Sequence, residues 1–518
     1  MRHEKHSGCC GCSLGEMGRR SFLTAASGAA LAAPVLGGCA TSASKKSSST
    51  VATLRGERAG SKEPLVVQPA LAYHIYERRE QTSWRPWGGL HTEANINEEI
   101  ARIEQELENL AKQAEFPIEF RPVAQVTNNE QGTQVRDGDA DVVLIYGATA
   151  GAQTMESMIS DQRHNLVFVR HKSGPVYLWY EIVHPRLLRK TVDEYGQPGL
   201  DVADVVVDEY GDMLWRMRAQ YALKRTMGSS IVCIGGPSGW GAGGRVAPDI
   251  ARNLWKMNLV DVPYDDLGKR IVAARKDAAR VKASEAAASE YLRESGTELH
   301  TDAGFVSRAF LLTDVFKEVM DEANAPAVTV NNCMGTIMPL AETTACLTLS
   351  LLNDDGYLAF CESDFAVIPS GVLLHHISGL PVFLQDPTFP HHGVVTLAHC
   401  TAPRRMNGKK REPAKILTHF ESDYGAAPKV EMKLGQTVTV IDPDFADKRW
   451  VGFRGTIADN PFLDICRSQV DVAIEGDCDT LAREMRGFHW MLCYGDHLRE
   501  TGYALSKLGV DWMDLTRA

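Results

Sequence analysis

The feature that most restricts the fold is an alternation of short apolar runs with helical segments over residues 64–330. The apolar runs are rich in Val, Ile and Leu and have the length of buried strands; they cover residues 64–67, 140–146, 166–169, 230–234, 259–262 and 327–330. Segments with helical spacing or composition lie between them, at 95–112, 247–257, 265–294 and 305–323. Strands that alternate with helices favour a parallel sheet, so the pattern predicts an α/β fold with doubly wound parallel sheets.

The pattern changes after about residue 380. Short strand-like runs separated by Gly, Pro and Asp turns cover residues 394–397, 430–433, 437–441 and 470–474. Helical segments return only at 479–486 and 496–508. We therefore predict two doubly wound parallel-sheet domains, residues 64–228 and 229–380, followed by a β-rich C-terminal domain over residues 381–518.

The N-terminal 39 residues have the pattern of an export signal. Arg19 and Arg20 precede Phe22-Leu23 and a weakly apolar run of small residues, which resembles a twin-arginine signal. Leu36-Gly37-Gly38-Cys39 resembles a lipobox, and the Ser/Thr/Lys-rich residues 40–63 are typical of a flexible linker. The pattern predicts a protein of the periplasm or one anchored to the membrane through Cys39; the alternative is a disordered tail with a chance Arg-Arg pair.

The charge and the cysteines exclude several classes of protein. A formal net charge of −11 gives no basic surface for nucleic acid. The chain has 12 cysteines, but no CxxC pair occurs after residue 12. This spacing is typical of neither a zinc site nor a disulfide framework, so we interpret the later cysteines as small buried hydrophobes.

Acidic residues follow two apolar runs in the central part of the chain. Glu362 and Asp364 come after residues 357–360, and Asp386 comes after residues 381–384. The carboxyl ends of buried strands are where open α/β folds bind their ligands. Carboxylate oxygens are also the ligands that hard divalent cations prefer. The two runs therefore predict a metal site at the ends of two strands.

The sequence around these acids resembles the L-fucose/L-arabinose isomerase family, over residues 328 to 515. Residues 373–386 follow the pattern Leu-Leu-x-x-x-Ser/Thr-Gly-x-Pro-Val-Phe-x-x-Asp, and the spacing from Glu362 to Asp386 matches that of the two acidic metal ligands of the family. Residues 396–403 and 487–496 resemble two further family segments. The last segment often reads His-His-x-x-x-x-Tyr-Gly-Asp, and here Phe488 replaces the first histidine, which leaves His489 as the third ligand.

The resemblance implies a sugar ketol isomerase. It assigns a divalent metal, Mn²⁺ first, to Glu362, Asp386 and His489, and it gives the two acids the catalytic proton transfer through an enediol of an open-chain sugar. His399 is an additional candidate for a metal ligand or substrate contact, with a structural histidine as the alternative. The family also implies a homo-oligomer, a trimer or hexamer, with the cleft built partly by a neighbouring subunit.

Other interpretations remain open at this stage. A non-catalytic carbohydrate-binding envelope protein would keep the same fold, and a third option is a metal-assisted reaction on a polyol or sugar acid. Asp364 is expected in a supporting or turn role. The pair His375-His376 is expected to pack on a helix. The loop pair His391-His392 and the aromatic segment 84–91 each fit either a substrate pocket or plain structure.

Overall fold

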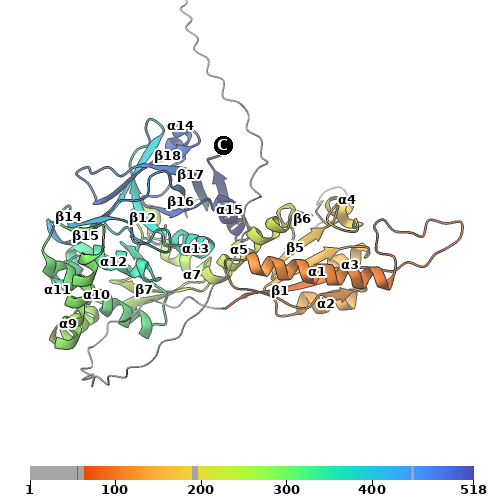
Figure 1. Ribbon diagram of the computed structural model, residues 1–518, viewed down its shortest axis with the longest axis horizontal. Coiled ribbons are helices and arrows are strands. Elements are labelled where there is room, and N and C mark those ends of the chain that lie inside the picture. Colours follow the sequence, from red (N-terminus) through yellow and green to blue (C-terminus); the bar gives the residue numbers. More distant parts are fainter. Residues whose placement is uncertain (1–54, 56–62, 189–196, 445–447, 518) are drawn as a thin grey trace, which may run out of the picture. The chain divides into compact units, whose positions relative to one another are not determined.

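The computed structural model describes residue 55 and residues 63–188, 197–444 and 448–517 (Figure 1). These residues form an α/β fold with two parallel sheets and a β-rich C-terminal region that contains a closed antiparallel barrel. This confirms the predicted α/β fold class and the predicted change to a β-rich region after about residue 380. The finer description of the parallel sheets as doubly wound stays a prediction.

The first parallel sheet has the strand order β2-β1-β4-β5-β6, and β3 also pairs with β1. Its strands are β1 (Leu65–Ala72), β2 (Ile118–Phe120), β3 (Ala124–Val126), β4 (Val142–Gly147), β5 (His164–Val169) and β6 (Val205–Val207). The helical segments in this region are α1 (Glu93–Gln113), α2 (Asn129–Asp137), α3 (Ala152–Met158), α4 (Trp179–Val183), η1 (His184–Leu188), η2 (Val202–Asp204) and α5 (Tyr210–Thr226). Every residue of β4 is buried, as expected for a central strand of a parallel sheet.

The second parallel sheet has the order β11-β10-β7-β8. Its strands are β7 (Ser230–Ile234), β8 (Asn258–Val262), β10 (Ala327–Val330) and β11 (Leu358–Cys361). The associated helices are α6 (Gly241–Gly244), α7 (Ala247–Asn253), α8 (Tyr264–Lys276), α9 (Ala278–Arg293), α10 (Ala303–Glu322), η3 (Cys333–Ile337), α11 (Met338–Ala341), α12 (Ala345–Asp354) and α13 (Ile368–Ser378). The helical segment predicted at 265–294 is two helices, because Asp277 accepts hydrogen bonds from Ala279 N and Arg280 N and so caps a new helix.

The C-terminal region is built on antiparallel strands. The order β16-β19-β12-β13-β18-β17 is closed by pairing of β16 with β17, and β20 adds to β17 in parallel. The strands are β12 (Phe383–Pro387), β13 (Val394–His399), β16 (Thr437–Asp444), β17 (Arg449–Asp459), β18 (Ser468–Glu475), β19 (Trp490–Tyr494) and β20 (Asp511–Asp514). A separate sheet contains β15 (Tyr424–Val430), β14 (Ala414–His419) and β9 (Thr297–Leu299), and the helices are α14 (Cys478–Glu484) and α15 (Leu498–Ser506). The strand predicted at 430–433 is displaced, since β15 already ends at Val430.

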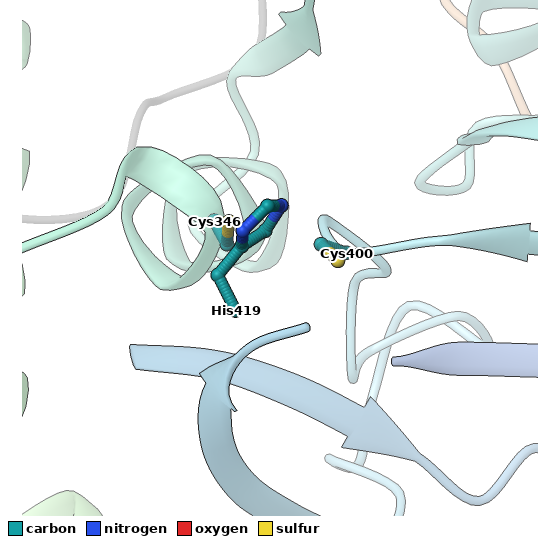
Figure 2. Close-up of side chains that lie close together, drawn as sticks. All are labelled: Cys346, Cys400 and His419. Carbon is teal, nitrogen blue, oxygen red and sulfur yellow. The ribbon is translucent and has the colours of Figure 1, made fainter. Parts of the chain in front are cut away.

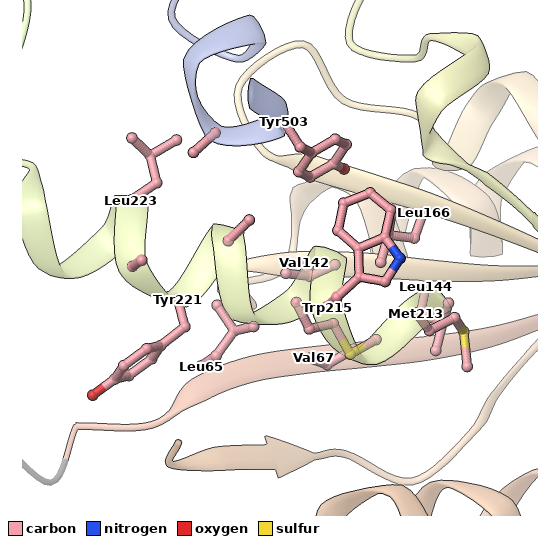
Figure 3. Packing of buried hydrophobic residues seen from close by; sticks show 14 of the residues in the cluster. Leu65, Val67, Val142, Leu144, Leu166, Met213, Trp215, Tyr221, Leu223 and Tyr503 are labelled. Atoms are coloured by element: carbon pink, nitrogen blue, oxygen red, sulfur yellow. The ribbon is translucent and has the colours of Figure 1, made fainter. Parts of the chain in front are cut away.

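The closing helix α15 packs against the first parallel-sheet region. Figure 3 shows Tyr503 of α15 beside Trp215 of α5, and their ring centroids are 5.6 Å apart. The Tyr503 hydroxyl donates a hydrogen bond of 2.7 Å to Asp204 Oδ1. Both rings belong to the hydrophobic core that also contains Leu65 and Val142. Helix α15 is therefore held against the N-terminal part, and the predicted boundaries at 228 and 380 stay predictions.

The predicted signal (1–39), its Cys39 lipid anchor and nearly all of the predicted linker (40–63) lie outside the described residues. Among the described helices, none is by itself both long and apolar enough to cross a membrane. One pair, Cys333–Ala341 with Ala345–Asp354, meets the length and composition test only together, and it is bent by 90°.

Candidate metal centre

Glu362 occupies a tight turn directly after the parallel strand β11. Glu362 and the following Ser363 both have left-handed backbone conformations, with φ of 66° and 50°. Such conformations cost about 1 kcal/mol or more for each residue with a side chain. Ser363 N donates a 3.1 Å hydrogen bond to Thr329 Oγ1, and Ser238 N donates one of the same length to Ser363 O. The turn is thus held by its neighbours, and the Glu362 carboxylate lies beside His489.

Asp386 and His489 come from the barrel. Asp386 lies near the end of β12, and His489 immediately precedes β19. These strands pair in antiparallel register with Gln385 opposite Trp490, which brings Asp386 and His489 together. The two acids therefore belong to different sheets, one parallel and one antiparallel, and they meet where these sheets adjoin.

The structure brings all four predicted site residues together. His489 Nε2 lies 3.2 Å from Asp386 Oδ1 and 3.5 Å from Glu362 Oε2. His399 Nε2 lies 3.9 Å from Glu362 Oε1. One ligand atom each of Asp386, His399 and His489 lies within 4.8 Å of the other two. His399 Nδ1 also contacts Thr401 Oγ1 at 3.1 Å, which fixes the orientation of its ring.

The ligand atoms of these residues do not satisfy one another by hydrogen bonding, and a bound cation would satisfy them. Glu362 Oε2, Asp386 Oδ1 and His489 Nε2 are all buried, and none has a hydrogen-bond partner of acceptable geometry. Buried polar atoms are normally satisfied, so three unsatisfied atoms converging on one point need an explanation. A divalent cation held by two carboxylate oxygens and an imidazole nitrogen would satisfy all three at once.

Asp364 orients His489 from behind. Its Oδ2 lies 2.8 Å from His489 Nδ1, and its Oδ1 accepts hydrogen bonds from the backbone N–H groups of Trp240 and Ala366. Both Asp364 and His489 are buried. A carboxylate on the far nitrogen of a ligating histidine fixes the tautomer and raises the basicity of the ligand. The contact with His489 Nδ1 is thus consistent with the supporting role expected for Asp364.

We expect Asp364→Asn to weaken Mn²⁺ binding by about 10- to 100-fold, because the amide keeps the shape but loses the charge that orients His489. Calorimetric titration with Mn²⁺ at fixed pH measures this effect. Asp249→Asn is the matched control, since Asp249 lies exposed on α7 and pairs only with Arg252 among the contacts described. An unchanged Mn²⁺ affinity in Asp364→Asn would remove the orienting role.

The electrostatics of the centre are those of a histidine held among acids. Burial raises the pKa of Asp386. Burial also acts to raise the pKa of Glu362, but His489 and His399 outweigh it and the pKa is lowered. Burial acts to lower the pKa of His489, yet Asp364 and Glu362 raise it to about 9. A pKa of about 9 means that His489 holds its proton at neutral pH, and a cation binding at Nε2 would have to displace it.

Glu362, Asp386 and His399 line a cavity of about 530 Å³, and the buried His489 contacts two of them. Trp240 and Phe488 also line it, with their rings stacked 4.7 Å apart at an interplanar angle of 10°. Phe488 thus contributes an apolar face where the resembling family often has histidine. The other sequence candidates lie elsewhere: residues 84–87 line a separate depression, and none of the histidines at 375, 376, 391 and 392 lines the cavity.

A second group of side chains, which was not predicted from the sequence, lies in the wall of the same cavity. Cys346, Cys400 and His419 approach one another there (Figure 2). Their positions are far apart in the chain, so no motif spacing could reveal them. Only the folded chain brings the first turn of α12 next to the ends of β13 and β14.

Comparison of the chain with models of known protein families and with curated proteins finds no match.

Proposed function

We propose that this chain is a metal-dependent aldose–ketose isomerase acting on an open-chain sugar. Glu362, Asp386 and His489 would hold the divalent cation, for which Mn²⁺ is the first choice. The two carboxylates would transfer the proton. The observation that supports this best is the convergence of three buried, unsatisfied ligand atoms on one wall of a cavity that suits a small polar substrate.

The reaction needs a group that moves a proton between neighbouring carbons. Isomerisation takes one proton from carbon 2 to carbon 1 and one from the carbon 2 hydroxyl to the carbon 1 oxygen, so no oxidant or reductant is consumed. A bound cation would polarise the carbonyl and the neighbouring hydroxyl. Glu362 and Asp386 both reach the space in front of His489, so one carboxylate can accept the carbon proton through an enediol and return it. His399 faces Glu362 and can bind a substrate hydroxyl.

The Trp240–Phe488 stack provides a surface for the carbon chain of the substrate. We expect Trp240→Ala to raise KM by about fivefold with little change in kcat, because a lost aromatic contact is worth about 1 kcal/mol of binding. Steady-state kinetics of ketose formation test this. Trp87→Ala is the control, since Trp87 is also exposed and lines a different depression. A Trp240→Ala enzyme with wild-type KM would exclude the stack from the substrate site.

The proposed function is tested by incubating the purified chain with a panel of aldoses and deoxyaldoses in the presence of Mn²⁺. Ketose formation that depends on Mn²⁺ is the expected result. Tight sugar binding without turnover would contradict the isomerase proposal and favour a carbohydrate-binding protein. If no aldose in the panel is converted but a separately tested polyol or sugar acid is, the chain catalyses a different metal-assisted reaction.

A further inference from the structure

Four sulfur and nitrogen side chains gather beside the carboxylate centre. Cys346 lies in the first turn of α12, Cys400 directly follows β13, and His419 ends β14 (Figure 2). One ligand atom of each lies within 4.8 Å of the other two. Cys466, which lies just before β18, packs against the buried group that contains Cys346 and Cys400. Cys346, Cys400, Cys466 and His419 are named here the thiol cluster.

We propose that the thiol cluster is a second metal site, built for Zn²⁺, that is distinct from the carboxylate centre. Three thiolates and one imidazole are a complete tetrahedral ligand set of the kind that structural zinc sites use. A Zn–S bond of about 2.3 Å places tetrahedral ligands about 3.8 Å apart. The ligand atoms of Cys346, Cys400 and His419 already lie within 4.8 Å of one another, so they need to close by about 1 Å or less.

The segments that carry the cluster are tied together by contacts outside it. Arg467 Nε donates a 2.7 Å hydrogen bond to Thr418 O, which joins the Cys466 segment to the strand of His419. The backbone N–H of Arg467 points at Cys400 Sγ at 3.5 Å. Thr344 Oγ1 donates to Ala426 O at 3.1 Å and so fixes the start of α12 against β15. Such bonds hold the ligands near the binding geometry before an ion arrives.

His419 is oriented in the same manner. Its Nδ1 contacts Ser422 Oγ at 3.2 Å, and a contact at this nitrogen leaves Nε2 as the natural donor to an ion. Cys346, Cys400 and His419 are buried, while Cys466 is partly accessible from the cavity. The cluster thus has both a closed interior and a route of entry through the cavity. Binding releases the thiol protons, and the three thiolates with Zn²⁺ then leave a net charge of −1 at the site.

The two centres would prefer different cations because their ligand atoms differ. The carboxylate centre offers oxygen and imidazole, which suit Mn²⁺, whereas the thiol cluster offers sulfur, which Mn²⁺ binds poorly and Zn²⁺ binds well. His399 and Cys400 are consecutive in the chain and line the same cavity, so a zinc ion at the cluster would fix the strand end that carries His399. This inference does not depend on the proposed isomerase activity.

The experiment uses the full chain, purified under reducing conditions, loaded with Zn²⁺ and dialysed against a weak chelator before metal analysis. The carboxylate centre can also bind Zn²⁺, so zinc content is compared between variants, and we expect the wild type to hold one zinc ion at the thiol cluster. Cys466→Ser is expected to lose it, and Cys478→Ser is the matched control because Cys478 is also partly exposed and lies on α14 outside the cluster. Glu362→Gln is expected to retain the zinc ion, which separates this site from the carboxylate centre.

A second measurement needs no variant. Co²⁺ bound to the wild-type cluster is expected to show sulfur-to-metal charge-transfer absorption and the intense visible bands of tetrahedral coordination. Zinc retained in Cys466→Ser, or Co²⁺ spectra without thiolate bands, would overturn the proposal. Cluster thiols that stay titratable after zinc loading, with no fewer reactive thiols than in the metal-free chain, or an intramolecular disulfide in place of a bound ion, would overturn it as well.

Discussion

We expect the replacement of Glu362 with glutamine to reduce the proposed isomerisation by about 10³-fold while the chain stays folded. Glutamine keeps the size of the side chain, but its amide cannot accept a proton from carbon, and loss of general acid–base catalysis costs about 10²- to 10⁴-fold in rate. Its partner His489 is buried, but Asp364 and Asp386 stay beside the imidazole and still compensate its charge. Ketose formation gives the rate, and circular dichroism with thermal unfolding checks the fold.

Glu421→Gln is the control for this substitution. Glu421 also lines the cavity but is not among the groups that converge on His489. We expect it to retain most of the wild-type rate. A Glu362→Gln enzyme with full activity, at any metal concentration, would remove Glu362 from the proposed proton transfer.

Removal of divalent cations is expected to abolish turnover completely, and Mn²⁺ is expected to restore it. The apparent Mn²⁺ affinity should depend on pH in a defined direction. Asp364 and Glu362 raise the pKa of His489 to about 9 against the effect of burial, so the metal-free histidine is protonated at neutral pH. Binding displaces that proton, and the affinity should therefore rise about tenfold for each pH unit until about pH 9.

The measurement is a Mn²⁺ titration of the chelator-treated enzyme at several pH values, monitored by recovered activity and by calorimetry. His489→Gln should bind Mn²⁺ more weakly and lose this pH dependence, because the titrating ligand is gone. Full turnover after exhaustive chelation, or a Mn²⁺ affinity that falls as pH rises towards 9, would contradict the metal assignment.

The sequence was sufficient for parts that depend on local pattern. Buried apolar runs predicted the strands β4, β7 and β10. The position of Glu362 and Asp386 directly after two apolar runs made these acids candidate metal ligands. His489 needed the family resemblance, since a single histidine before a strand carries no signal of its own. Its contact with Asp364 is a consequence of the fold, because the two residues lie in different sheets.

Other parts depended on contacts that no local pattern encodes. Periodicity could not show that β16 pairs with β17 to close a barrel, or that α15 packs on α5 through Tyr503. Composition could not separate α8 from α9, since the break is a single capping side chain at Asp277. The thiol cluster was missed for a related reason: its members come from four separate segments, and each cysteine alone looks like an ordinary buried hydrophobe.

The central claim is that Glu362, Asp386 and His489 share one cation. Anomalous diffraction from crystals of the chain grown with Mn²⁺ tests it most directly. The account predicts a manganese peak within bonding distance of a Glu362 oxygen, an Asp386 oxygen and His489 Nε2. A saturated crystal with no peak there, or with manganese bound only at other residues, would contradict it.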